Sequence, residues 1–148
     1  MKVKGDDDSY VLDRGLNESI RLDAQHLLWS MHLGYSLHPL IDVRDGMQIA
    51  DLGCGTGIWL MDVARALPDT VRLHGLDISD QQFPARELWP ANLTFSALDA
   101  FAAAPPAELQ ARFDVVHLGM WTSIPKARGV DALVDNVKMM LSKDDQRR

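Results

Sequence analysis

The most informative segment of this 148-residue chain is Ile49-Ala50-Asp51-Leu52-Gly53-Cys54-Gly55-Thr56-Gly57-Ile58-Trp59. Its apolar beginning predicts a buried strand, and its end predicts the start of a helix. Between them, glycines alternate with other residues, and an acid precedes the first glycine by two positions. Because glycine adopts positive φ and lets a ligand approach the backbone, the pattern D-x-G-x-G-x-G predicts a tight, ligand-binding turn. A merely tight turn between a strand and a helix is the alternative.

The spacing of these glycines differs from that of two other nucleotide-binding turns. Dinucleotide-binding turns read G-x-G-x-x-G, and phosphate-binding P-loops end in G-K-[ST]. Neither pattern occurs at 53–57. The helix that begins near Ile58 offers free N–H groups and a positive dipole end, which suit a carboxylate. Asp51, at the end of the strand, suits a cationic ammonium group.

Strands alternate with helices through most of the chain. The expected strands are 48–52, 71–76, 93–98 and 113–118. The expected helices are 59–67 and 131–141, with short helices or turns at 81–88 and within 100–112. This alternation predicts a parallel α/β sheet with right-handed connections.

A long helix is expected before the first strand, from Asn17 to Leu37. Asn17 is its expected N-cap, and His38-Pro39 is expected to end it. Apolar residues recur at helical intervals and give this helix an apolar stripe. The stripe consists of Ile20, Ala24, Leu27 and Met31.

Acids also end the second and third expected strands. Asp77 lies 20 residues after Gly57 (77 − 57), and an acid at about that distance commonly binds ribose hydroxyls. Asp99 is placed to accept a hydrogen bond from an adenine amino group, and the residues that would pack against the base are Ile78, Ala100 and Phe101. Because the carboxyl ends of parallel strands share one edge, we expect all three acids on one rim. The alternative for each acid alone is a strand-end or helix-cap carboxylate.

The glycine turn with its acid resembles the first motif of class I S-adenosylmethionine-dependent methyltransferases. A narrower resemblance is to the methyltransferase family that is common in fungal secondary-metabolite gene clusters and includes methyltransferase-like regulators. It runs from about Tyr10 to the last helix. The segments that carry it, besides the turn, are Asn17-Glu18-Ser19-Ile20-Arg21-Leu22-Asp23-Ala24-Gln25-His26, His38-Pro39, Gly75-Leu76-Asp77-Ile78-Ser79 and Phe113-Asp114-Val115-Val116-His117-Leu118.

The resemblance implies a Rossmann-like, mostly parallel sheet with an N-terminal helical extension. The family's sheet has seven strands, whereas this chain supplies four, so the sheet is expected to be truncated after the cofactor-binding half. We expect a flexible lead at 1–9, a helical cap at 10–45, an incomplete S-adenosylmethionine-binding domain at 46–143 and a charged tail at 144–148. The fourth strand would then have an exposed edge, which a homodimer or a partner chain would cover.

The resemblance also implies S-adenosylmethionine as cofactor, held by turn and strand-end residues. These residues are Asp51, Gly53, Cys54, Gly55, Thr56, Gly57, Asp77, Ile78, Asp99, Ala100, Leu118 and Gly119. The N-terminal helix of the family covers the cofactor, which adds Tyr10, Arg21 and Gln25; a solvated polar face is the alternative. His117 is a candidate general base, and a histidine packed or hydrogen-bonded at the end of a strand is its alternative. The family often has Arg where Gly119 stands.

The implied function is transfer of a methyl group to a small-molecule acceptor. The alternatives are a catalytically incomplete binding or regulatory protein and a truncated fragment of a longer methyltransferase. A net charge of −6 without a basic stripe argues against nucleic acid as a partner. With one cysteine, no secretory signal and no apolar run of about 18 residues, we expect no internal disulfide, no metal site and no membrane span. A cytoplasmic location is expected, or a nuclear one for a regulator.

Overall fold

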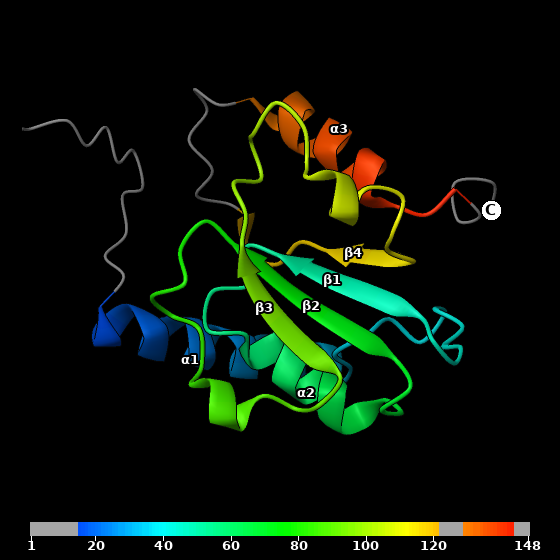
Figure 1. Cartoon of the computed structure of the whole chain (residues 1–148). Coiled ribbons are helices and arrows are strands. Elements are labelled where there is room, and N and C mark those ends of the chain that lie inside the picture. The colour runs from blue at the N-terminus through cyan, green and yellow to red at the C-terminus, as the bar shows by residue number, and fades with distance from the viewer. Residues whose placement is uncertain (1–14, 122–128, 144–148) are drawn as a thin grey trace, which may run out of the picture.

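The computed structural model describes residues 15–121 and 129–143. Four parallel strands form one sheet in the order β3-β2-β1-β4. The helices α1 and α2 lie on one face of this sheet, and α3 lies on the other (Figure 1). The strands are β1 (Gln48–Leu52), β2 (Arg72–Asp77), β3 (Leu93–Ala97) and β4 (Val115–His117). The predicted parallel α/β sheet is therefore confirmed.

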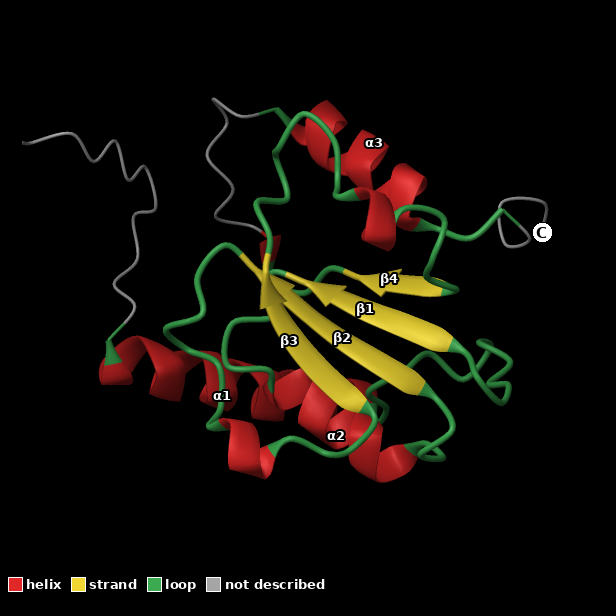
Figure 2. Ribbon diagram, in the orientation of Figure 1, coloured by secondary structure: helices red, strands yellow, loops and turns green. Residues whose placement is uncertain are grey.

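The helices fall close to their predicted positions. Figure 2 shows them around the sheet as α1 (Leu16–Leu33), α2 (Ile58–Ala66) and α3 (Val130–Met140). The predicted segment 81–88 forms a helix only in its last turn, η1 (Arg86–Leu88), and the loop 100–112 contains the short helix η2 (Ala107–Leu109). No helix in the described ranges is long and apolar enough to cross a membrane.

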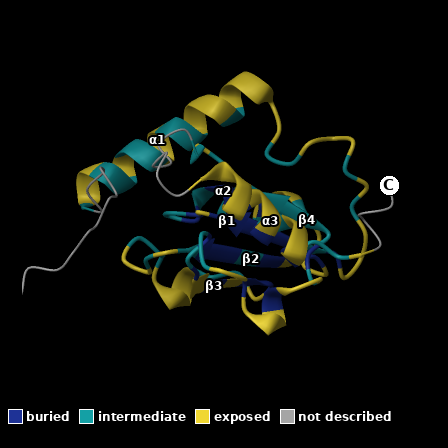
Figure 3. Cartoon of the chain, turned by 90° about the horizontal axis from the view of Figure 1, so that it is seen from above, coloured by how far each residue is buried: buried dark blue, intermediate teal, exposed yellow. Residues whose placement is uncertain are grey.

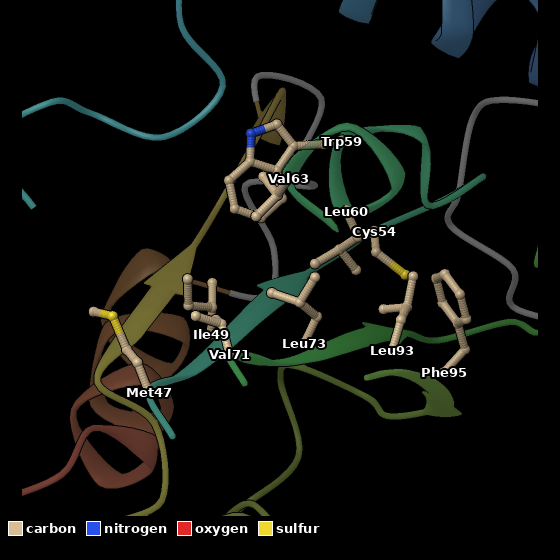
Figure 4. Close-up of a cluster of buried hydrophobic side chains, with 10 residues drawn as sticks. All are labelled: Met47, Ile49, Cys54, Trp59, Leu60, Val63, Val71, Leu73, Leu93 and Phe95. Atoms are coloured by element: carbon tan, nitrogen blue, oxygen red, sulfur yellow. The ribbon is translucent and has the colours of Figure 1, made fainter. Parts of the chain in front are cut away.

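Two apolar clusters, one on each face of the sheet, form the core. Ile49 of β1 and Leu73 of β2 pack towards α2, together with Trp59 and Leu60 (Figure 4). The next residue of β1, Ala50, belongs instead to the cluster on the α3 side. Successive side chains of a strand point to opposite faces, so a sheet covered by helices on both faces buries nearly every residue of its central strand.

The boundaries predicted for the first helix are wrong at both ends. Gly15 occupies the N-cap position in place of Asn17, without a side-chain cap. The helix ends before Gly34, whose φ of 75° is left-handed and whose N–H donates to Ser30 O. Glycine at this position ends a helix without the steric cost that a side chain would add, so the helix stops before His38-Pro39.

The apolar stripe of α1 faces solvent. Ile20 is 57% exposed, Leu27 60% and Met31 74%, and the outward surface of the helix is seen in Figure 3. The opposite, polar face turns towards the domain, where His26 Nε2 lies 2.7 Å from Asp62 Oδ2 and Gln82 Nε2 donates to Ser19 Oγ at 3.3 Å. Polar contacts therefore hold α1 in place.

The outer edge of β4 begins to pair with the segment that follows α3. Phe113 and Leu141 form a parallel bridge, and Ser142 N donates to Phe113 O at 2.8 Å. Among the described residues, no strand continues this pairing along Val115–His117. The segment after α3 therefore runs beside the start of β4 and parallel to it. The edge predicted to be open lies along the strand after this bridge, at Val115–His117.

Phe95 of β3 packs directly against two glycines. A Cβ on Gly57 would lie 2.5 Å from the ring, and one on Gly75 would also collide with it. Phe83 and Trp89 contact the same ring, with centroids 5.2 and 5.0 Å away. The ring is therefore held between these aromatic side chains and the two glycines.

We predict that Gly57→Ala destabilises the fold more than Gly46→Ala does. Both glycines have φ near +73° (72° and 74°), but nothing lies within 4 Å of a Cβ at Gly46. Gly46→Ala should cost about 1–2 kcal/mol through the left-handed backbone alone, and Gly57→Ala about 1–3 kcal/mol more through overpacking. Urea unfolding of both variants measures the difference, and equal losses would contradict the contact with Phe95.

His74 of β2 gives the fold a dependence on pH. Its Nδ1 is 3.0 Å from Thr94 Oγ1, and its Nε2 is 3.3 Å from Arg112 Nη2. Burial lowers the pKa of His74 to about 4, with further lowering by Arg112 and Arg72. The imidazole is therefore neutral in the folded protein at pH values at which the unfolded chain already protonates it.

We predict that the free energy of unfolding falls less steeply in His74→Asn than in wild type as the pH is lowered towards 4. The unfolded state binds a proton near pH 6.5 and the folded state only near 4. The contribution of His74 is therefore complete above about 6.5 and is lost as the pH falls towards 4. The difference in unfolding free energy between wild type and variant, measured from pH 7.5 to 4, should shrink in that window. A constant difference would refute the prediction.

Candidate functional site

The turn between β1 and α2 has left-handed backbone at all three glycines. The φ angles are 76° at Gly53, 52° at Gly55 and 72° at Gly57, so the conformation predicted for this turn is confirmed. Protein side chains already occupy the space of two of the missing Cβ atoms, with Trp121 beside Gly53 and Phe95 beside Gly57. The glycines thus serve internal packing as well as any ligand.

Asp51 is a buried carboxylate at the carboxyl end of the central strand. Its exposure is 4%, and its Oδ1 lies 2.8 Å from His117 Nδ1. Its Oδ2 has no hydrogen bond to any described residue. Burial raises the pKa of Asp51 above its usual value, against the lowering effect of His117. The site therefore holds a carboxylate with one oxygen satisfied and the other unpaired.

The position of His117 is fixed from two sides. It is the register partner of Asp51 on the adjacent strand, and its ring stacks on Trp59 with centroids 3.9 Å apart and planes 6° from parallel. The Trp59 indole is itself anchored, because its N–H donates to Ser36 O at 2.8 Å. This is the packed, hydrogen-bonded histidine of the alternative interpretation, and the role of general base stays a prediction.

Asp77 lies beside the turn at the end of β2. Gly55 N donates to Asp77 Oδ2 at 2.8 Å, and Ser79 N donates to Oδ1 at 3.3 Å. An ionised carboxylate has about four acceptor sites, so lone pairs remain for a ligand. Ile78, the next residue, is exposed, as a residue that packs on a base requires.

Asp99 lies on the same rim as Asp77. Leu98 N donates to Asp77 O at 2.7 Å, which joins the ends of the two strands. Asp99 Oδ1 accepts a hydrogen bond from Phe101 N at 2.9 Å. Ala100 is buried in the core on the α3 side, and its carbonyl accepts from Asn136 Nδ2 at 2.9 Å. The backbone of this loop is therefore held from α3.

The remaining predicted residues of the turn and of β4 have defined surroundings. Thr56 Oγ1 donates to Asp23 Oδ1 of α1 at 2.6 Å. Cys54 is buried in the core, and burial raises the pKa of its thiol. Leu118 and Gly119 follow His117, and a Cβ on Gly119 would lie 2.9 Å from the His117 ring. Their predicted contacts with a cofactor stay predictions.

The polar residues predicted on α1, Arg21 and Gln25, are partly buried and bonded within the helix. Arg21 is hydrogen-bonded to Glu18 and donates to Gln25 Oε1 at 2.7 Å. Leu22, which was not predicted, approaches the turn, since its Cδ1 would lie 3.1 Å from a Cβ on Gly55. Tyr10 lies outside the described residues.

Two further residues support this rim: Trp121, for which the sequence left a pocket wall and the core as alternatives, and Asn136, which sequence reasoning missed. Trp121 packs on Gly53, and its N–H donates to Leu52 O at 2.8 Å. Asn136 of α3 is buried and holds the carbonyls of Ala100 and Ala102. Neither residue belongs to a motif, and only the place of Asn136 on the same helix face as Leu133 and Met140 signals it.

The strand order places this site at a topological switch point. The chain proceeds from β1 to β2 and β3 on one side, and then returns to β4 on the other side of β1. Ligands of open α/β sheets bind outside the carboxyl ends of the strands at such a point. Asp51 and His117 lie on its two sides. This sheet, with its glycine turn and three strand-end acids, defines a Rossmann-like protein of the methyltransferase class.

Comparison with known families agrees with this class. Residues 49–144 match the family model described as a methyltransferase domain. The chain belongs to this methyltransferase family.

Its curated relatives are fungal proteins of secondary metabolism and related methyltransferases. The chain is 33% identical to the methyltransferase grgD of a Penicillium species over 140 residues, which cover 89% of the chain and 48% of grgD. It is 37% identical to the secondary metabolism regulator laeA of Aspergillus flavus over 116 residues, which cover 75% of the chain and 29% of laeA. The chain thus spans about half or less of the length of these relatives.

Solved structures show the same fold. The phosphoethanolamine N-methyltransferase 2 of Haemonchus contortus, solved in complex with S-adenosyl-L-methionine, aligns with a TM-score of 0.60 and 20% identity. The alignment covers 77% of this chain and 26% of that protein. At this identity, the likeness extends to the fold alone.

We predict that Asp51→Asn leaves the fold at least as stable at pH 7. Because burial raises the folded-state pKa of Asp51 above the unfolded value near 3.9, wild type loses stability as the pH rises from about 4 through the raised pKa. The neutral amide avoids this cost and still accepts a hydrogen bond from His117. Thermal unfolding at pH 4 and pH 7 tests the prediction, and a variant that is much less stable at pH 7 would contradict it.

Proposed function

We propose that this chain binds S-adenosylmethionine and belongs to an enzyme that transfers the methyl group to a small-molecule acceptor. One observation carries the proposal: a buried carboxylate with an unpaired oxygen stands beside a glycine turn at the switch point of the sheet. Oδ2 keeps access to solvent, because it is not one of the buried polar atoms without a partner, but the burial of Asp51 still makes its negative charge costly. A ligand with a cationic ammonium group would offset this cost, and the methionine end of the cofactor carries one.

The chemistry of the other rim residues fits the rest of this cofactor. Asp77 keeps acceptor capacity for the ribose hydroxyls. Asp99 would accept a hydrogen bond from the adenine amino group, and the exposed Ile78 would pack on the base. When bound, the cofactor supplies a methyl group on a sulfonium sulfur. The residues of this chain would bind and align it, and alignment is the main contribution that a protein makes to such a transfer.

A second candidate is a methyltransferase-like regulator without turnover. It is favoured by the similarity to the regulator laeA and by Gly119, which lacks the charge that the fungal family often places there. The part of the β4 edge that no described residue pairs with would then pair with a second copy or a partner chain. We expect a cytoplasmic location for an enzyme and a nuclear one for a regulator. Light scattering separates a monomer from an edge-paired dimer.

We predict that the chain binds S-adenosylmethionine and that Asp77→Asn weakens binding about tenfold. The substitution removes a charge-assisted acceptor for the ribose, and a tenfold change corresponds to about 1.4 kcal/mol. Asp80→Asn is the matched control, since Asp80 is an exposed acid three residues further on. Isothermal titration measures both affinities. The absence of binding by a folded sample would reject the proposed function.

A further inference from the structure

We propose that His117 is a positioning residue for the amino-acid end of the cofactor. Its imidazole holds Oδ1 of Asp51, so that Oδ2 is presented to the ammonium group of the ligand. The inference rests on the proposed function, and it assigns to His117 a role other than that of general base. It concerns binding of the cofactor and is independent of which acceptor is methylated.

Two contacts fix the orientation of the His117 ring. Asp51 and His117 are paired in register across β1 and β4, so both side chains point to the α2 face of the sheet. The distance of 2.8 Å between Nδ1 and Oδ1 is that of a hydrogen bond. Stacking on Trp59, 3.9 Å away and nearly parallel, fixes the plane of the ring. The imidazole is therefore held before any ligand arrives.

The orientation of the imidazole decides which carboxylate oxygen is free. Nδ1 binds Oδ1, and Oδ2 has no hydrogen bond to a described residue although Asp51 is 4% exposed. Without a donor at Oδ1, the carboxylate could rotate and both oxygens would lack a partner. A group that fixes one oxygen thus aims the other, as outer-shell hydrogen bonds orient the ligands of a binding site.

The charges around Asp51 agree with a cationic ligand. Asp77 adds a second negative charge that disfavours the ionised form of Asp51, and only His117 and the more distant His26 favour it. His26 is engaged with Asp62 and Ser30. His117 is therefore the one group among the described residues that touches the carboxylate and favours its charged form.

The test compares two ligands that differ in the amino-acid end. S-adenosylhomocysteine carries the ammonium group, and 5′-methylthioadenosine contains the adenosine part without it. His117→Phe keeps a ring against Trp59 but removes the donor, so it should weaken S-adenosylhomocysteine binding tenfold or more and leave methylthioadenosine binding within twofold. His117→Asn retains an N–H near the position of Nδ1 and should recover most of the loss. Isothermal titration measures the affinities of wild type and both variants for the two ligands, with thermal unfolding as a check on folding.

The outcomes separate this inference from the proposed function. If wild type binds neither ligand, the proposed function fails. If wild type binds both and His117→Phe weakens them equally or not at all, the function stands and the role of His117 is overturned. A readout on the wild-type chain covers the case in which variants do not fold: ¹⁵N NMR of the His117 ring should show a proton on Nδ1, and a ring protonated on Nε2 alone would overturn the inference.

Discussion

The hydrogen bond between Asp51 and His117 connects β1 and β4, the two neighbouring strands with the shortest pairing in the sheet. β1 pairs with β4 over only three register positions, and the last of these is the pair Asp51–His117. The bond therefore closes the carboxyl end of a short pairing at which backbone hydrogen bonds alone give little support. It also buries a carboxylate, a costly arrangement. The structure thus places a buried carboxylate at the switch point where ligands of this fold bind.

Local patterns made most of the sheet predictable from the sequence. The strand at 48–52 and the glycine turn are encoded in adjacent residues, and positive φ follows from glycine itself. The parallel direction of the strands follows from the alternation of elements and from right-handed connections, whereas these rules do not fix the order β3-β2-β1-β4. The three acids could be placed on one rim for the same reason. Their partners could not, because Gly55 N and Asp77 meet only after β1 and β2 have paired.

The orientation of α1 could not be predicted from its pattern. The apolar stripe through Ile20 and Leu27 indicates a helix but does not say which way that helix turns. In the structure, the orientation of α1 follows from tertiary polar contacts such as Thr56–Asp23 and His26–Asp62, which hold the polar face towards the domain. Contacts of Trp121 and Asn136 were equally invisible, since each depends on a residue more than 30 positions away.

The polar inner face of α1 makes physical sense beside an acidic rim. Asp51 and Asp77 bring two carboxylates to the edge of the sheet that α1 faces. An apolar helix surface there would remove water from both carboxylates and offer no hydrogen bonds in its place. Burial of a charge without such partners is unfavourable. Residues such as Asp23 and His26 instead give the turn and α2 hydrogen-bond partners. The polar face of α1 therefore lies towards the acidic rim, and its apolar stripe is left to solvent.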